Sequence, residues 1–181
     1  LRVPTKIITT ALIAAVMLSP LSGTALHAVS KEDTSQDKVT LLPKTSYKLI
    51  NGKKLRPKDY AGKAMLITFW ATWCPPCVAE IPHLNDLYKD YKDKGLVILG
   101  LSIDEKKSTV KRFMKKTAIN YPLAMATKQT IKELGPISAV PTTLIVNAKG
   151  EILYKVMGYE SKEKLEEIIL PLLPKIKSNS Q

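Results

Sequence analysis

Metal-binding residues are scarce in this sequence. Its 181 residues include two cysteines and two histidines, the latter being His27 and His83. Structural zinc sites use four ligands, usually arranged as two cysteine or histidine pairs, and this chain has no second cysteine pair. The sequence therefore predicts no metal site.

Aromatic residues are also few, at 6% of the chain, although the formal net charge is +12. The basic residues are spread along the sequence in pairs such as Lys53-Lys54 and Lys106-Lys107, without stacking aromatic residues among them. A nucleic-acid-binding domain gathers such charge on one face. We therefore expect a solvated basic surface that suits acidic partners or anionic lipid headgroups, and no nucleic acid partner.

Apart from the N-terminus, the chain has no long apolar segment outside its predicted strands. Arg2 and Lys6 precede an apolar stretch from Ile7 to Leu18, and the small residues Gly23-Thr24-Ala25 follow it. This layout is typical of a secretory signal, and the stretch is shorter than the roughly 20 residues that span a bilayer. It predicts an extracytoplasmic protein, in the periplasm or at the outer face of the cytoplasmic membrane.

Four segments are expected along the chain. Residues 1–28 are interpreted as a cleaved signal peptide or, alternatively, as an uncleaved N-terminal membrane anchor. Residues 29–46 are interpreted as a polar linker, and residues 176–181 as a polar tail. The hydrophobic residues, 45% of the chain, suffice for one domain core over residues 47–175.

Both cysteines lie in one place, at Cys74 and Cys77, directly after the strand-like run 64–70 and before a helical pattern. The free N–H groups and the positive dipole end of a helix start favour a thiolate, which predicts Cys74 as the nucleophile. Pro75 and Pro76 suit the first helical turn. A purely structural disulfide is the alternative, but so short a loop contributes little stability.

The pattern around this stretch predicts an α/β fold with a mixed central sheet flanked by helices and an N-terminal β-hairpin extension. The hairpin is expected over 47–55, around Asn51-Gly52. The uninterrupted apolar run 96–103 predicts a buried strand parallel to 64–70. The other expected elements are helices over 75–95, 108–117, 128–134 and 161–170, a short run at 121–124, and a hairpin of strands 142–146 and 151–156.

The motifs Trp73-Cys74-Pro75-Pro76-Cys77, Glu80-Ile81-Pro82 and Val140-Pro141-Thr142 resemble those of the TlpA/ResA/DsbE-like family of extracytoplasmic thiol-disulfide oxidoreductases. The resemblance covers about residues 45 to 173. It implies a thioredoxin-like fold and an enzyme that needs no cofactor besides its redox-active Cys74–Cys77 disulfide.

The resemblance also implies a cis proline at Pro141, beside the cysteines, where the backbone of Val140 pairs with a substrate strand. The alternative is an ordinary trans proline at the start of a strand. Further substrate contacts are implied at Trp73, Pro75, Pro76 and Thr142. Trp70, in contrast, is expected in the core.

Glu80 is predicted as a proton acceptor for Cys77. Thioredoxin carries a buried acid at the position equivalent to Thr68, whereas relatives of the ResA type carry a glutamate at the position of Glu80. Glu80 lies one helical turn after Cys77, on the same face of the helix. The alternative is a surface glutamate near the helix start. His83 is expected on the helix surface, with proton transfer as its alternative role.

The resulting hypothesis is a monomeric reductase of disulfides in exported proteins, such as apocytochrome c, that receives electrons from a membrane thiol-disulfide donor. A disulfide-forming oxidase of the same fold is the main alternative. A copper chaperone on this fold is more distant, because it would need a Cys-x-x-x-Cys spacing and a nearby histidine ligand.

Overall fold

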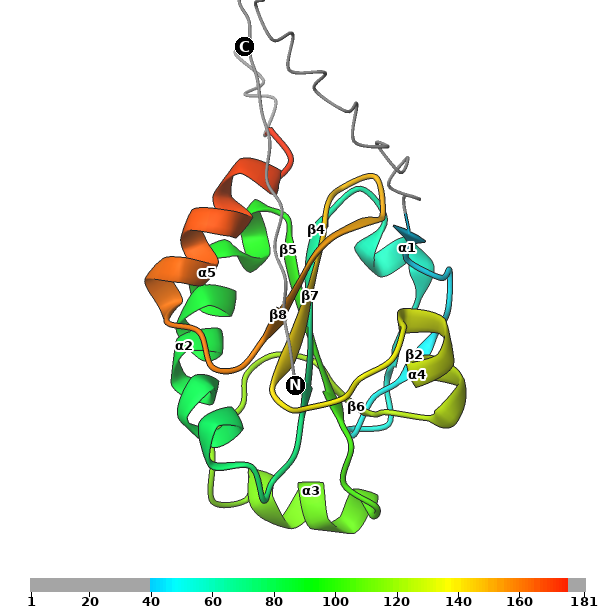
Figure 1. Ribbon diagram of the computed structural model, residues 1–181, viewed down its shortest axis with the longest axis vertical. Helices are drawn as coiled ribbons and strands as arrows, with labels where there is room; N and C mark the ends of the chain where they lie inside the picture. The colour runs from blue at the N-terminus through cyan, green and yellow to red at the C-terminus, as the bar shows by residue number, and fades with distance from the viewer. Residues whose placement is uncertain (1–39, 176–181) are drawn as a thin grey trace, which may run out of the picture. The chain divides into compact units, whose positions relative to one another are not determined.

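The computed structural model of the protein describes residues 40–175, and Figure 1 shows the arrangement of their helices and strands. The middle of the sheet is built from two parallel strands, β4 (Ala64–Trp70) and β5 (Leu96–Ser102), in which every residue is buried. α2 (Pro75–Tyr91) and a short 3₁₀ turn connect them. This βαβ unit confirms the prediction from the apolar runs.

Three more strands extend the sheet around this unit. β7 (Thr142–Val146) pairs antiparallel with β4, β8 (Glu151–Met157) pairs antiparallel with β7, and β6 (Leu123–Met125) pairs parallel with β5. With β1 (Thr40–Leu41) at the edge, the order of the six strands is β1-β8-β7-β4-β5-β6. The sheet is therefore mixed, as predicted.

Helices cover both faces of this sheet (Figure 1). α2 and α5 (Lys162–Ile169) pack on one face, where Leu66 and Ile98 of the central strands point. α1 (Pro57–Tyr60) and α4 (Lys128–Leu134) lie on the other side, where Met65 and Ile67 point. α3 (Lys107–Met114) follows β5. The alternation of side chains along β4 explains the two separate core clusters.

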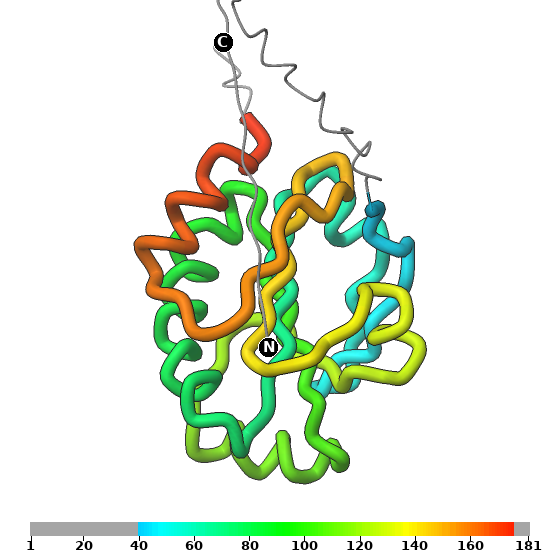
Figure 2. The backbone as a smooth tube through the Cα atoms, viewed as in Figure 1, coloured from blue at the N-terminus to red at the C-terminus, as the bar shows by residue number. Residues whose placement is uncertain are grey.

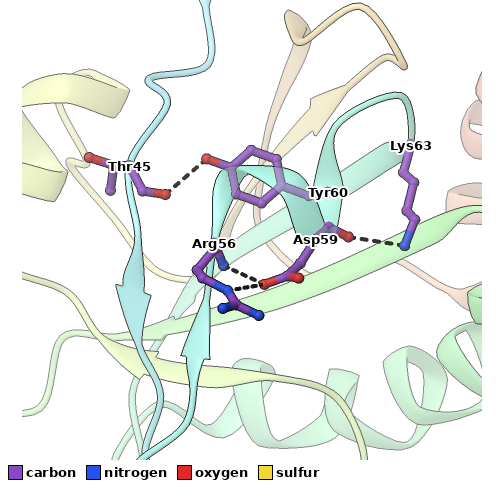
Figure 3. A network of polar contacts seen from close by, with 5 residues as sticks. All are labelled: Thr45, Arg56, Asp59, Tyr60 and Lys63. Atoms are coloured by element: carbon purple, nitrogen blue, oxygen red, sulfur yellow. Dashed lines mark hydrogen bonds and ion pairs between the residues drawn. The ribbon is translucent and has the colours of Figure 1, made fainter.

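The N-terminal hairpin forms where Asn51-Gly52 predicts it. β2 (Tyr47–Lys48) pairs antiparallel with β3 (Lys54–Leu55), and Gly52 has a φ of 89° in the turn between them. Tyr60 ties the preceding segment to α1, because its hydroxyl donates a hydrogen bond to the carbonyl of Thr45 (2.9 Å; Figure 3). Figure 3 also shows Asp59 accepting hydrogen bonds from the backbone N–H and the side chain of Arg56.

The predicted boundary between linker and domain is wrong. Thr40 and Leu41 form β1, opposite Ile152 and Glu151 of β8, and Leu42 is buried. The ordered domain therefore begins by residue 40 rather than 47, because a strand this short is stabilised by its partner in the sheet.

The predicted signal peptide or anchor, residues 29–39 of the linker and the polar tail lie outside the described residues. Within residues 40–175, no helix is long and apolar enough to cross a membrane.

Candidate active site

Cys74 lies at the end of the loop that connects β4 to α2. It is the N-cap residue of α2, and its Sγ accepts a hydrogen bond from the backbone N–H of Cys77 at 3.3 Å. The two cysteines form a disulfide and are buried, whereas Pro75 and Pro76, in the first turn of α2, are exposed. On reduction, the same N–H and the helix dipole stabilise a thiolate at Cys74.

The segment before β7 is distant from the disulfide in the sequence but lies beside it in the fold. The Val140–Pro141 peptide bond is cis, as the resemblance implies, and the carbonyl oxygen of Val140 lies 3.6 Å from Cys74 Sγ. Thr142 is fully buried, and its hydroxyl donates to the carbonyl of Ala139 at 2.7 Å. Its side chain therefore holds this turn in place instead of facing the surface around the disulfide, where a substrate contact was predicted.

The two tryptophans have different surroundings. Trp70 is buried, with its ring centroid 5.7 Å from that of Phe113, as predicted for a core residue. Trp73 is 65% exposed beside Cys74. It lines an apolar groove of about 430 Å³ whose other lining residues include Ile131, Ile137 and Val140. This groove offers an apolar surface next to the reactive sulfur.

Glu80 is buried, with 1% of its surface exposed. Its Oε1 accepts a hydrogen bond from the backbone N–H of Glu160 at 3.1 Å. Burial raises the pKa of Glu80 to about 7, and the Glu160 N–H opposes that rise. The alternative of a surface glutamate is wrong. Glu80 lies three residues after the buried Cys77, on the same face of α2, and that face points toward the sheet.

Tyr121 interacts electrostatically with this carboxyl group, and Thr68 lies in β4. Burial raises the pKa of the Tyr121 hydroxyl, and the charge of Glu80 raises it further. Thr68 is buried, and its Oγ1 has no hydrogen-bond partner within residues 40–175. The position that carries an acid in thioredoxin therefore holds a neutral hydroxyl here.

Asp104 is a site residue that the sequence reasoning missed. Its carboxylate accepts hydrogen bonds from the hydroxyl of Thr72 (2.6 Å), the backbone N–H of Thr72 (3.0 Å) and the hydroxyl of Ser102 (2.8 Å). These contacts fix the loop that carries Cys74 to the end of β5. A signal was available, because Asp104 follows a buried strand at the carboxyl edge of the sheet, where sites form in α/β folds.

The model of the AhpC/TSA family matches residues 40–155. The chain belongs to this family. Within residues 40–175, no three histidine, cysteine, aspartate or glutamate side chains gather in a way that could hold a metal ion. The same described part of this AhpC/TSA family member holds the Cys74–Cys77 disulfide.

Two relatives indicate which type of AhpC/TSA family member this chain resembles. The chain is similar to the thiol-disulfide oxidoreductase ResA of Bacillus thuringiensis subsp. konkukian (strain 97-27), with 35% identity over 125 residues, 69% of this chain and 72% of that protein. ResA of Bacillus subtilis (strain 168) is 28% identical over 159 residues, 88% of this chain and 89% of that protein.

Solved structures agree with this similarity. A thiol:disulfide interchange protein of the thioredoxin family from Chlorobium tepidum TLS has a TM-score of 0.71 and 32% identity, covering 76% of this chain and 98% of that chain. StoA from Bacillus subtilis has a TM-score of 0.60 and 26% identity, covering 68% of this chain and 93% of that chain. The fold is therefore thioredoxin-like, and this AhpC/TSA family member is a thiol-disulfide oxidoreductase of the ResA, DsbE and StoA type.

Proposed function

We propose that the protein reduces disulfide bonds of exported proteins outside the cytoplasm, with apocytochrome c as one substrate. One observation carries the exchange chemistry: Cys74 Sγ lies at the N-terminus of α2, 3.6 Å from the Val140 carbonyl and beside the exposed Trp73. The reducing direction rests on the resemblance to the TlpA/ResA/DsbE-like group.

In the first step, the Cys74 thiolate attacks one sulfur of the substrate disulfide. A mixed disulfide forms between Cys74 and the substrate, and the second substrate sulfur leaves as a thiolate that takes a proton from water. The N–H of Cys77, which lies 3.3 Å from Cys74 Sγ, stabilises the attacking thiolate before this step.

In the second step, Cys77 attacks the Cys74 sulfur and releases the substrate with both of its cysteines reduced. Two electrons have then passed from the protein dithiol to the substrate disulfide. Cys77 is buried, so its thiol must lose a proton to a neighbouring group. Glu80 suits this role, because a carboxyl group with a pKa of about 7 both accepts and returns a proton near neutral pH.

The surface around Cys74 suits an extended polypeptide. The backbone of Val140 lies beside the sulfur, and an added strand hydrogen-bonds to such a segment through its main chain. The groove between Trp73, Ile137 and Val140 is apolar and accepts an apolar side chain next to the substrate cysteine. Pro75 and Pro76 are exposed at the same edge and complete the contact surface.

The N-terminal sequence supports the proposed compartment, and the compartment in turn suggests the electron donor. The basic start, the apolar stretch 7–18 and the small residues after it are typical of an exported protein. An exported reductase oxidised at each turnover needs electrons from across the membrane, and a membrane thiol-disulfide protein is the donor we propose.

The reduction potential of the Cys74–Cys77 pair tests the direction of electron flow. It is measured by equilibrating the full chain with glutathione or dithiothreitol redox buffers and quantifying the disulfide. A potential near that of thioredoxin, about −270 mV, supports the reductase, whereas one near about −120 mV supports the alternative, a disulfide-forming oxidase.

A further inference from the structure

Three consecutive residues in the loop between β8 and α5 contact different parts of the active site. The N–H of Gly158 donates to the carbonyl of Pro141 at 2.8 Å, and the N–H of Glu160 donates to Glu80 Oε1 at 3.1 Å. Between them, the hydroxyl of Tyr159 lies 2.8 Å from Nε2 of His83 on α2. We call residues 158–160 the strap; Figure 2 traces its backbone from β8 across to α5.

We propose that Tyr159 and His83 are positioning residues that clasp the strap onto α2 and thereby keep the carboxyl group of Glu80 out of water. The proposal rests on the proposed role of Glu80 as the proton acceptor for Cys77. Neither clasp residue touches the sulfurs in this assignment, and both act through Glu80.

The geometry separates the clasp from the group that it protects. Tyr159 is 43% exposed and His83 is half-buried, so their contact lies at the surface, whereas Glu80 is 1% exposed. The rings of Tyr159 and His83 meet edge to face with centroids 5.7 Å apart, in addition to the hydrogen bond. A surface contact of this kind adds little to the core, but it fixes the backbone of the next residue, Glu160, over Glu80.

His83 and Glu80 are placed to act together by the helix itself. They lie three residues apart on α2, so their side chains project from neighbouring positions on one side of the helix. Tyr159 and Glu160 are adjacent in the strap, and the Tyr159 hydroxyl contacts His83 while the Glu160 N–H contacts Glu80. Opening of the clasp would therefore release the N–H that Glu80 accepts and admit water to the carboxyl group.

Other titratable groups around this site define what a pH experiment reports. Glu80 faces the hydroxyl of Tyr121 and the carboxylate of Glu160, and it shares α2 with Cys77. His83 faces Tyr159, and the pKa of Glu163 on α5 is lowered chiefly by a hydrogen bond from its own backbone and one from the Ser161 side chain, with a smaller contribution from His83. Because burial is the largest cause of the raised pKa of Glu80, access of water should lower that pKa even though one N–H partner is lost.

The strap also connects Glu80 with the segment that we propose to bind substrate. Its first residue bonds to Pro141, and its last residue bonds to Glu80. A substrate strand that pairs with Val140 therefore contacts the residue next to Pro141. The carbonyl of Pro141 in turn accepts the hydrogen bond from Gly158 of the strap.

The test follows the carboxyl resonance of Glu80 by ¹³C NMR during a pH titration of the oxidised full chain. Tyr159→Ala and His83→Ala should each lower the titration midpoint of Glu80 by about one pH unit or more, because water reaches the carboxyl group. Tyr159→Phe keeps the ring contact and should cause a smaller shift. The double variant should shift the midpoint no further than either alanine variant, as expected for one interaction.

Tyr154→Ala is the matched control, because Tyr154 is an exposed tyrosine on β8, 51% accessible, outside the strap. It should leave the midpoint unchanged. An unchanged midpoint in both Tyr159→Ala and His83→Ala would overturn the clasp, and so would additive shifts in the double variant.

The clasp and the proposed role of Glu80 can fail separately. Alkylation of Cys77 in a reduced Cys74→Ser background reports proton transfer, whereas the resonance of Glu80 reports the clasp. If Glu80→Gln leaves the pH profile of Cys77 alkylation unchanged, the acceptor role fails while a shifted Glu80 midpoint in Tyr159→Ala still supports the clasp. If instead Glu80→Gln changes the pH profile of Cys77 alkylation and Tyr159→Ala leaves the Glu80 midpoint unchanged, the clasp fails and the acceptor role of Glu80 stands.

Discussion

The carboxylate of Asp104 accepts two hydrogen bonds from Thr72, one from its hydroxyl at 2.6 Å and one from its backbone N–H at 3.0 Å. Thr72 lies two residues before Cys74, and Asp104 follows β5, so this contact joins the redox loop to the neighbouring strand. It holds the loop that carries Cys74, and the carbonyl oxygen of Val140 lies 3.6 Å from the sulfur of that cysteine.

Asp104→Asn should destabilise the protein and slow the reaction of Cys74. The new amide group places a donor where Thr72 needs an acceptor, and an unsatisfied buried donor costs about 1–3 kcal/mol. Urea denaturation measures the loss of unfolding free energy, and reaction with a small aromatic disulfide measures the rate. Asp59→Asn is the control, since Asp59 accepts hydrogen bonds at an exposed helix start, and it should change the reaction rate of Cys74 by no more than experimental error.

Exchange of either cysteine by serine should separate the two steps of the reaction. Cys74→Ser should abolish the acceleration by this protein of insulin reduction by dithiothreitol, because the nucleophile is lost. Cys77→Ser should accumulate mixed disulfides at Cys74, since the second step needs the Cys77 thiol. Non-reducing gel electrophoresis with mass spectrometry detects them. Recovery of free Cys77→Ser protein alone, or full activity of Cys74→Ser, would contradict the order of attack.

Trp73→Ala should weaken the reaction with protein substrates and leave the fold intact. Trp73 is 65% exposed, so its loss should change the unfolding free energy by no more than about 0.5 kcal/mol. A buried aromatic contact in an interface is worth more than about 1 kcal/mol, which predicts a fall in kcat/KM of about fivefold or more for a protein disulfide.

Steady-state kinetics with a protein disulfide and with a small aromatic disulfide distinguish a contact between Trp73 and the substrate from a change in the reactivity of the Cys74 sulfur. The small disulfide should react at the wild-type rate, and Tyr154→Ala should leave both reactions unchanged. Equal losses for the two substrates would show that Trp73 acts on Cys74 rather than on the substrate.

The strands and helices that surround the disulfide could be predicted because each carries its own signal. β4 runs from Ala64 to Trp70 as predicted, since seven consecutive residues of a buried parallel strand are nearly all apolar. The helix start at Cys74 followed from Pro75 and Pro76. The hairpin of β7 and β8 followed from two strand-like runs around Asn147–Gly150.

The remaining features depend on partners that are distant in the sequence. Thr40 and Leu41 form a strand because β8 offers a free edge, and two residues carry too little periodicity to show it. The contacts of Tyr159 with His83 and of Glu160 with Glu80 join residues of α2 to a loop far along the chain. The burial of Glu80 likewise depends on that loop, which left the surface alternative open in the sequence.

Glu80→Gln should flatten the pH dependence of stability of the oxidised protein between pH 4.5 and about 7. The pKa of Glu80 rises from 4.5 to about 7 on folding, so the folded state holds this proton more tightly than the unfolded chain. The stabilisation is therefore complete below pH 4.5 and is lost as the pH rises through about 7. At about 1.4 kcal/mol per pH unit, the loss in the wild type amounts to about 3 kcal/mol at most.

Urea denaturation at a series of pH values measures this slope. Glutamine keeps an acceptor for the Glu160 N–H but carries no charge, so the variant should be more stable than the wild type at pH 8. Glu163→Gln is the matched control: the pKa of Glu163 is lowered, so its titration lies below this window and the slope should match the wild type. A wild-type slope in Glu80→Gln would show that the carboxyl group gains access to water in solution, and the assignment of Glu80 as a buried proton acceptor would then fail.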